Sequence, residues 1–308
     1  MWTKFNDVGT PVWKFLFVEQ SVLEEYTRQV IRTGVGKGIY YQEWRMTFLS
    51  PKPITDSKGV AQDQEYYLDI INNVIEEEKG RFNGMFLGAK IIYRVSREFT
   101  AEGPSFFKFL GVQPQVENFI RLRKNPKWRK LIAGNNTPNF ISISTLTSAT
   151  LGFDIVGQED NPAFHINEEY EKQIDEVVES TKADTGAGSA STEYPFGLPF
   201  HTGESTSTNG NAQKNLVFLA NYAEKTTNDF PHVQFRGGHT VLLAKQPAML
   251  EKYNKLNIHS ELCLISNNVL GTNNDATDYK TIYQPIVSHN SASFNGDDPT
   301  YQQYDLNP

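Results

Sequence analysis

Residues 198–204 read LPFHTGE, an apolar run that ends in a histidine, a glycine turn and an acid. Residues 232–240, HVQFRGGHT, repeat this pattern, with glycines before the terminal histidine. Further apolar or β-branched runs precede and follow these two, and stretches with helical spacing separate them. The runs lie at residues 39–48, 85–95, 150–156, 198–201, 232–239, 258–266 and, more weakly, 286–295. The helix-like stretches lie at residues 21–32, 63–79, 115–124, 168–181, 215–226 and 247–255.

Strands that alternate with helices favour parallel βα units, and hence the α/β fold class. Seven strands over about 260 residues are more typical of a (β/α)8 TIM-type barrel than of an open sheet. Because the pattern begins with a helix and is one strand short, we expect the first strand to be missing. We treat residues 1–308 as a single domain, within which the low-complexity stretch 183–192, ADTGAGSAST, is expected to be a flexible loop.

The composition excludes several classes of protein. The 308 residues carry 29 basic and 36 acidic side chains, a net charge of −7, which argues against nucleic acid or an anionic membrane as the main partner. The only cysteine, Cys263, cannot form an intrachain disulfide, and we expect it to be buried rather than reactive. No apolar run approaches the ~20 residues of a membrane span, and the first residues show no signal-peptide pattern.

Polar side chains at the ends of the predicted strands are the candidates for chemistry, because barrel enzymes place catalytic groups there. His201 and Glu204 end one run, and His239 follows two glycines at the end of another. Imidazoles bind transition metals, and a carboxylate that is off the metal can move protons. A third place is residues 295–299, NGDDP, where Asp297 and Asp298 point to opposite sides of an extended chain. Each signal alone is also compatible with an ordinary turn or a chance pairing, and for HTGE and NGDDP taken singly that is the favoured interpretation.

Taken together and in this order, HTGE, RGGH, ELCLISNNVLG and GDDP resemble the adenosine deaminase superfamily of metal-dependent (β/α)8 hydrolases. The adenosine deaminase-related growth factor branch is the more similar one. Other matching stretches are WTKF at 2–5, YYQEWR at 40–45, FLGAKIIY at 86–93 and GFDIVGQED at 152–160. The resemblance covers approximately residues 2–299.

This resemblance implies roles for seven residues. His201 and Asp297 resemble two ligands of a single Zn²⁺ ion. Glu204 resembles the acid that protonates purine N1, and His239 the imidazole that orients and deprotonates the attacking water. The other correspondences concern the substrate: Asp298 steers water and contacts purine N7, Gly157 contacts the purine through its backbone, and Glu43 contacts the ribose.

The chain departs from the family in its metal ligands. The family's first strand ends in His-x-His, whereas no two of the six histidines here (His165, His201, His232, His239, His259 and His289) are two residues apart. We expect His165, His259 and His289 at the surface or in loops, and His232 near the start of its strand. WTKF places the missing pair upstream of Met1, and the chain stops shortly after GDDP, where the family has a last helix. We therefore expect a fragment, cut at both ends, that binds zinc poorly.

The expected function is the family's reaction, hydrolytic deamination of adenosine or 2′-deoxyadenosine to inosine or 2′-deoxyinosine and ammonia, within purine metabolism and adenosine catabolism. Because only two of four zinc ligands are present, we expect slow turnover or none. One alternative is a catalytically inactive, nucleoside-binding or growth-factor-like relative. Another is AMP or adenine as substrate, although residues 201–213 hold no Lys or Arg to bind a 5′-phosphate.

Compartment and assembly follow only from the resemblance. It implies an extracellular, secreted protein, and the lack of a visible signal peptide leaves the cytoplasm as an alternative. The branch forms homodimers through an N-terminal extension and an insert. Neither is identifiable here, so a homodimer remains an open alternative.

Overall fold

The computed structural model describes residues 19–46, 54–96, 112–125, 152–156, 168–184, 196–204, 210–264, 267 and 279–295. All statements below refer to these residues. None of the helices among them is both long and apolar enough to cross a membrane.

Seven parallel strands form one sheet, and their order in the sheet is their order in the chain. The strands are β1 (Tyr41–Met46), β4 (Gly88–Ser96), β5 (Gly152–Val156), β6 (Phe196–Thr202), β7 (Val233–His239), β8 (His259–Leu262) and β9 (Ala292–Phe294). The predicted α/β class with a parallel sheet is confirmed. No ladder joins β1 to β9 within the described part of the chain, so the sheet is not closed there.

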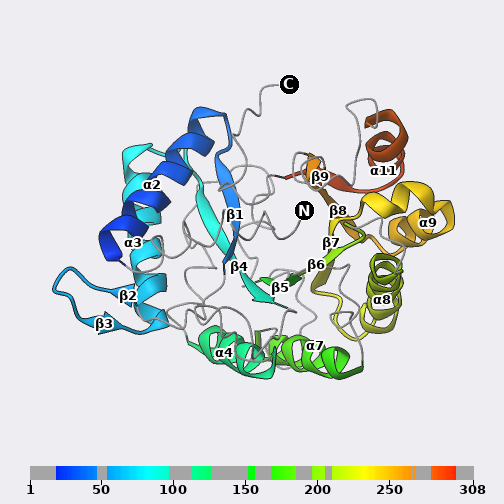
Figure 1. Ribbon diagram of the computed structural model, residues 1–308, viewed down its shortest axis with the longest axis horizontal. Helices are drawn as coiled ribbons and strands as arrows, with labels where there is room; N and C mark the ends of the chain where they lie inside the picture. Colours follow the sequence, from blue (N-terminus) through cyan, green and yellow to red (C-terminus); the bar gives the residue numbers. More distant parts are fainter. Residues whose placement is uncertain are drawn as a thin grey trace.

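Helices lie around the outside of the strands (Figure 1). They are α2 (Gln20–Gly36), α3 (Gln64–Arg81), α4 (Val112–Lys124), α7 (Glu168–Ser180), α8 (Asn211–Thr226), α9 (Pro247–Lys255) and α11 (Gln284–His289). In α2 the buried residues recur every fourth position, at Leu23, Thr27, Ile31 and Val35, so one face of the helix packs inward. The Asp63 side chain accepts the Tyr66 N–H and caps the start of α3.

Two elements differ from the sequence-based expectation. The stretch 286–295, predicted as one strand, contains most of α11 followed by the three-residue strand β9. The antiparallel hairpin of β2 (Ile54–Thr55) and β3 (Ala61–Gln62) was not predicted. Its turn is held by Asp56, whose Oδ1 accepts the N–H groups of Lys58 and Val60. Strands of two residues are too short to show alternation.

The core lies between the sheet and the helices. Its buried aromatic side chains include Tyr93, Phe119, Phe196 and Phe200. The predicted flexible loop 183–192 has its first two residues in a 3-10 helix, η2 (Thr181–Asp184), and the rest falls outside the described residues. The assignment of one domain to the whole chain stays a prediction.

Candidate active site

The carboxyl end of β6 carries two of the predicted site residues. His201 is in the last part of the strand, and Glu204 follows it with only 4% of its surface exposed. Between them Gly203 has a φ of +69°, a conformation that side chains with a Cβ rarely adopt. A Cβ here would also press on the Leu216 side chain at about 3.1 Å. The glycine therefore permits the turn that directs Glu204 back into the protein.

The carboxyl end of β7 carries the third, His239. Its φ is +67°, and that of the next residue, Thr240, is +47°. Two consecutive left-handed residues with side chains are unfavourable, at about 1–3 kcal/mol each. Backbone hydrogen bonds to the end of β6 hold this conformation: Thr240 N–H donates to Thr202 O at 2.9 Å, and Leu242 N–H to Gly203 O at 3.1 Å.

These three side chains meet. His239 Nδ1 lies 3.6 Å from Glu204 Oε1, and the His201 and His239 ring centroids are 4.9 Å apart. Adjacent parallel strands bring this about, because Thr202 of β6 is in register with His239 of β7. The arrangement combines two imidazoles and a buried carboxyl group. Such side chains can act as general acids and bases toward a bound substrate.

Sequence reasoning missed two residues beside His239. Asn267 Oδ1 lies 2.9 Å from His239 Nδ1, and Asn267 Nδ2 donates to the Tyr283 hydroxyl at 3.2 Å. The available signal was position, because Asn267 comes five residues after Leu262, the end of β8, at the same edge of the sheet as the ends of β6 and β7.

Glu43 is engaged elsewhere in the sheet. Its Oε2 lies 2.6 Å from Arg236 Nη1, and Arg236 also pairs with Glu261, which in turn pairs with Arg45. Burial lowers the pKa of Arg236, but Glu261 and Glu43 outweigh it, and the net pKa is raised. Arg236 precedes His239 by three residues, about 10 Å along the strand. Glu43 thus takes part in an ionic cluster with Arg236, Glu261 and Arg45. Its predicted contact with ribose stays a prediction.

A metal centre is not assembled by the described residues. No three or more His, Cys, Asp or Glu side chains among them are placed to hold an ion. Of the predicted ligands, His201 is described, whereas Asp297 lies outside the described residues, as do Asp298 and Gly157. Since a catalytic zinc takes three protein ligands, the donors on hand do not fit one by themselves.

The other histidines have structural surroundings. His232 precedes β7, as predicted, and its Nε2 is 2.6 Å from the Thr181 hydroxyl. His259, expected at the surface or in a loop, is partly exposed but lies at the start of β8, where it bonds to the hydroxyls of Ser291 and Ser293. His289 is exposed at the end of α11, as predicted, and His165 lies outside the described residues. Cys263 is buried, as predicted.

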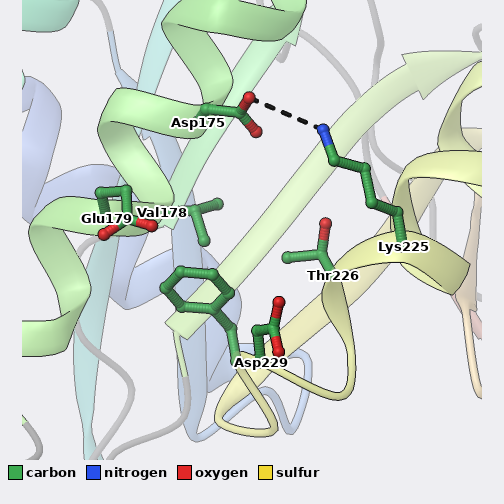
Figure 2. Close-up of a pocket in the computed structure, with 7 residues that line it drawn as sticks. Asp175, Val178, Glu179, Lys225, Thr226 and Asp229 are labelled. Carbon is green, nitrogen blue, oxygen red and sulfur yellow. Dashed lines mark ion pairs between the residues drawn. The ribbon is translucent and has the colours of Figure 1, made fainter.

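A pocket elsewhere contains none of these residues. Figure 2 shows it between α7, which contributes Asp175, Val178 and Glu179, and the end of α8 with Lys225 and Thr226. Asp229 and Phe230, which complete it, lie before β7, at the end of that strand opposite to His239. Lys225 is paired with Asp175 at 3.7 Å, so the pocket's cation is already balanced within the protein.

Comparison with known proteins gives sequence relatives with a named activity. The chain is 28% identical over 260 residues to an adenosine deaminase from Phlebotomus duboscqi, covering 84% of the chain and 37% of the relative. It is 24% identical over 303 residues to adenosine deaminase 2-A from Danio rerio, covering 97% and 48%. The chain is similar to adenosine deaminases. It spans less than half the length of these adenosine deaminases, and no family model matches it.

Solved structures of deaminases and amidohydrolases share the fold. The N6-methyl-AMP deaminase of Arabidopsis thaliana matches with a TM-score of 0.52 and 14% identity, over 94% of this chain and 66% of that one. A zinc-bound amidohydrolase from Burkholderia ambifaria matches with a TM-score of 0.53 and 12% identity, over 93% and 60%. At these identities the similarity concerns the fold alone.

Proposed function

We propose that the chain derives from a zinc-dependent hydrolytic deaminase of adenosine and 2′-deoxyadenosine, which releases inosine or 2′-deoxyinosine and ammonia. The observation that carries this proposal is the meeting of His201, Glu204 and His239 at the ends of β6 and β7. Sequence similarity to adenosine deaminases supports it. The seven-stranded sheet is then part of a (β/α)8 barrel.

The proposed roles of these residues follow from the chemistry of deamination. Adenine is a poor electrophile at C6, and amide ion is a very poor leaving group. Glu204, whose carboxyl group is buried, donates a proton to purine N1, so that the negative charge of the attack collects on a neutralised ring. His239 takes the proton of the attacking water and later helps to deliver one to departing ammonia. Gly157 and Asp298 are the proposed substrate contacts, and Asp298 also steers the water.

The chain lacks part of the proposed set of zinc ligands. A Zn²⁺ ion, if bound, would supply hydroxide at neutral pH, because zinc lowers the pKa of coordinated water to about 7. His201 and Asp297 are the ligands that this chain offers, and it contains no His-x-His to complete the set. We therefore propose that the 308-residue chain binds zinc weakly and deaminates slowly.

The test is a zinc analysis and a long-incubation adenosine assay on the 308-residue chain with added Zn²⁺. We expect less than one zinc per chain and slow formation of inosine. Glu204→Gln should reduce this rate by at least about 100-fold, since a positioned acid contributes about 10²–10⁴. Glu224→Gln is the control, because Glu224 is exposed on α8 and pairs only with the surface residue Lys252 in the part of the chain that the structure describes.

Other results would redirect the proposal. Stoichiometric zinc with ordinary turnover would contradict the deficiency. Adenosine binding with no conversion sensitive to Glu204 would favour an inactive, nucleoside-binding relative. Faster conversion of AMP or adenine would change the substrate, and a nucleotide is the substrate named for the Arabidopsis thaliana deaminase that shares the fold. From the family resemblance we also propose that the protein is secreted. The same resemblance leads us to propose a homodimer.

A further inference from the structure

Three buried side chains from three parts of the chain form a hydrogen-bonded series that ends on His239. The Tyr283 hydroxyl accepts from Asn267 Nδ2 at 3.2 Å, and Asn267 Oδ1 faces His239 Nδ1 at 2.9 Å. Their exposed fractions are 3% for Tyr283, 0% for Asn267 and 1% for His239. Burial makes each of these polar contacts costly to lose.

The surroundings of His239 Nδ1 decide which ring nitrogen carries the proton. Two oxygen acceptors face this nitrogen: the Asn267 amide oxygen and, at 3.6 Å, Glu204 Oε1. An acceptor pair of this kind favours a hydrogen on Nδ1, and in a neutral imidazole the lone pair is then on Nε2. A base needs that lone pair to face its substrate.

We propose that Asn267 and Tyr283 are positioning residues that hold His239 as the Nδ1–H tautomer, with Nε2 as the basic nitrogen. The inference rests on the proposed function, in which His239 deprotonates water. Asn267 fixes the tautomer through its oxygen, and Tyr283 fixes the orientation of the Asn267 amide by accepting from its nitrogen.

The backbone around these residues is fixed. Asn267 N–H donates to Cys263 O at 3.0 Å, and Cys263 directly follows β8. Tyr283 ends a π-helical turn, η4 (Tyr279–Tyr283), which continues into α11. The backbone beside His239 is held by the hydrogen bond from Thr240 N–H to Thr202 O. All three side chains therefore start from ordered positions, as a positioning role requires.

The first test reads the tautomer directly and needs no activity. The ring nitrogens of His239 are observed by NMR in the metal-free, histidine-labelled 308-residue chain, with His239→Gln for assignment. We expect a protonated Nδ1 and an unprotonated Nε2. Asn267→Leu, which cannot accept a hydrogen bond, should move the proton in part or wholly to Nε2. Asn267→Asp, which keeps an acceptor oxygen, should preserve the wild-type tautomer and answers the question if the leucine variant does not fold.

Tyr93 provides a matched control. Its hydroxyl accepts from Asn118 Nδ2 at 3.0 Å, the same type of bond as in the Tyr283–Asn267 pair, but on β4 and α4. Tyr283→Phe should increase the fraction of the other tautomer, whereas Tyr93→Phe should leave His239 unchanged. If Asn267→Leu folds and keeps the wild-type tautomer, or if the wild type carries the proton on Nε2, the proposal is overturned.

The second test is kinetic. Removing a residue that supports a reacting group typically costs 10–100-fold in activity. We expect Asn267→Leu to lower kcat by about that factor with KM changed less than about 2-fold, and Tyr93→Phe to change neither. An unchanged kcat in Asn267→Leu overturns the positioning role. If the wild type converts no adenosine, the proposed function fails, and the NMR experiment alone decides about the tautomer.

Discussion

His239 and Thr240 have positive φ values although neither is a glycine. Thr240 is the more unusual, because a β-branched side chain in this region of φ and ψ is a genuine outlier. Its side chain is fully buried, and its hydroxyl has no hydrogen-bond partner among the described residues. The end of β7 thus stores strain beside the candidate catalytic histidine, as is common at functional sites.

Substitution of Thr240 measures this strain. At ordinary positions glycine is less stable than alanine by roughly 0.5–1 kcal/mol. At Thr240 we expect the reverse, with Thr240→Gly more stable than Thr240→Ala by about 1 kcal/mol, because only glycine adopts a φ of +47° without strain. Urea denaturation of both variants measures the difference in the free energy of unfolding.

Gly237 gives an independent check of the same site. A Cβ on Gly237 would approach Thr240 Cγ2 to 2.5 Å, which is too close for a real contact. Gly237→Ala should therefore destabilise the wild type and do so less in the Thr240→Gly background. A Thr240→Gly variant less stable than Thr240→Ala would show that the turn carries no strain.

At this scale the sequence predicted part of the site. His201, Glu204 and His239 could be brought together because each follows an apolar run, and the ends of parallel strands meet at one edge. Asn267 and Tyr283 were missed, since they lie between β8 and β9 and neither an amide nor a phenol is a usual metal ligand or a base at neutral pH. The engagement of Glu43 with Arg236 depends on side-chain directions across β1 and β7, which no local pattern encodes.

Among the elements, β9 is attached to β8 partly through side chains. His259 of β8 bonds through Nδ1 to the Ser291 hydroxyl at 2.7 Å and through Nε2 to the Ser293 hydroxyl at 2.8 Å. The pKa of His259 is lowered, chiefly by burial and further by Arg236, whereas Glu261 and Glu43 act in the opposite direction. The folded protein therefore favours the neutral ring.

This makes the stability of the protein depend on pH. As pH falls below about 6.5, the unfolded chain takes up a proton on His259 more readily than the folded one. The unfolded state then binds more protons, so the stability that His259 contributes above this pH is lost as the medium becomes more acidic. We expect His259→Gln to flatten the dependence of the unfolding free energy on pH between about 7 and 5. His289→Gln, at an exposed position, is the control, and equal slopes in all three proteins would contradict the prediction.

Most elements could be predicted because their hydrophobic patterns are long. Helix α9 occupies the predicted residues 247–255, and the predicted strands 150–156 and 232–239 contain β5 and β7. The failure at 286–295 has a physical cause, because α11 and β9 are both short and give one continuous mixed pattern. Short elements are specified by their neighbours more than by their own sequence.

For the whole molecule, the ionic cluster of Arg45, Glu43, Arg236 and Glu261 connects β1 with β7 and β8. In the sheet order β1 is separated from β7 and β8 by three or more strands, so the cluster joins parts of the sheet that no ladder pairs in the described residues. Glu261, only 1% exposed, pairs with both arginines. Its charge is therefore central to the cluster.

Glu261→Gln should lower the free energy of unfolding by about 3 kcal/mol, because it leaves two largely buried arginines with a single acid. Urea denaturation measures this effect. Glu171→Gln is the control, since it breaks the exposed pair with Lys225 and should change stability by less than about 0.5 kcal/mol. Similar effects of the two substitutions would mean that the buried cluster adds nothing beyond an ordinary surface pair.

The order of strands in the sheet also has a consequence for synthesis on the ribosome. Each strand pairs with the one made just before it, so the growing chain can add its ladders one after another as it emerges. The bond between Arg45 and Glu261 joins residues 216 positions apart and must wait until β8 has left the exit tunnel. Its closure is then a late event of folding, and conservative substitutions there should speed unfolding more than they slow folding.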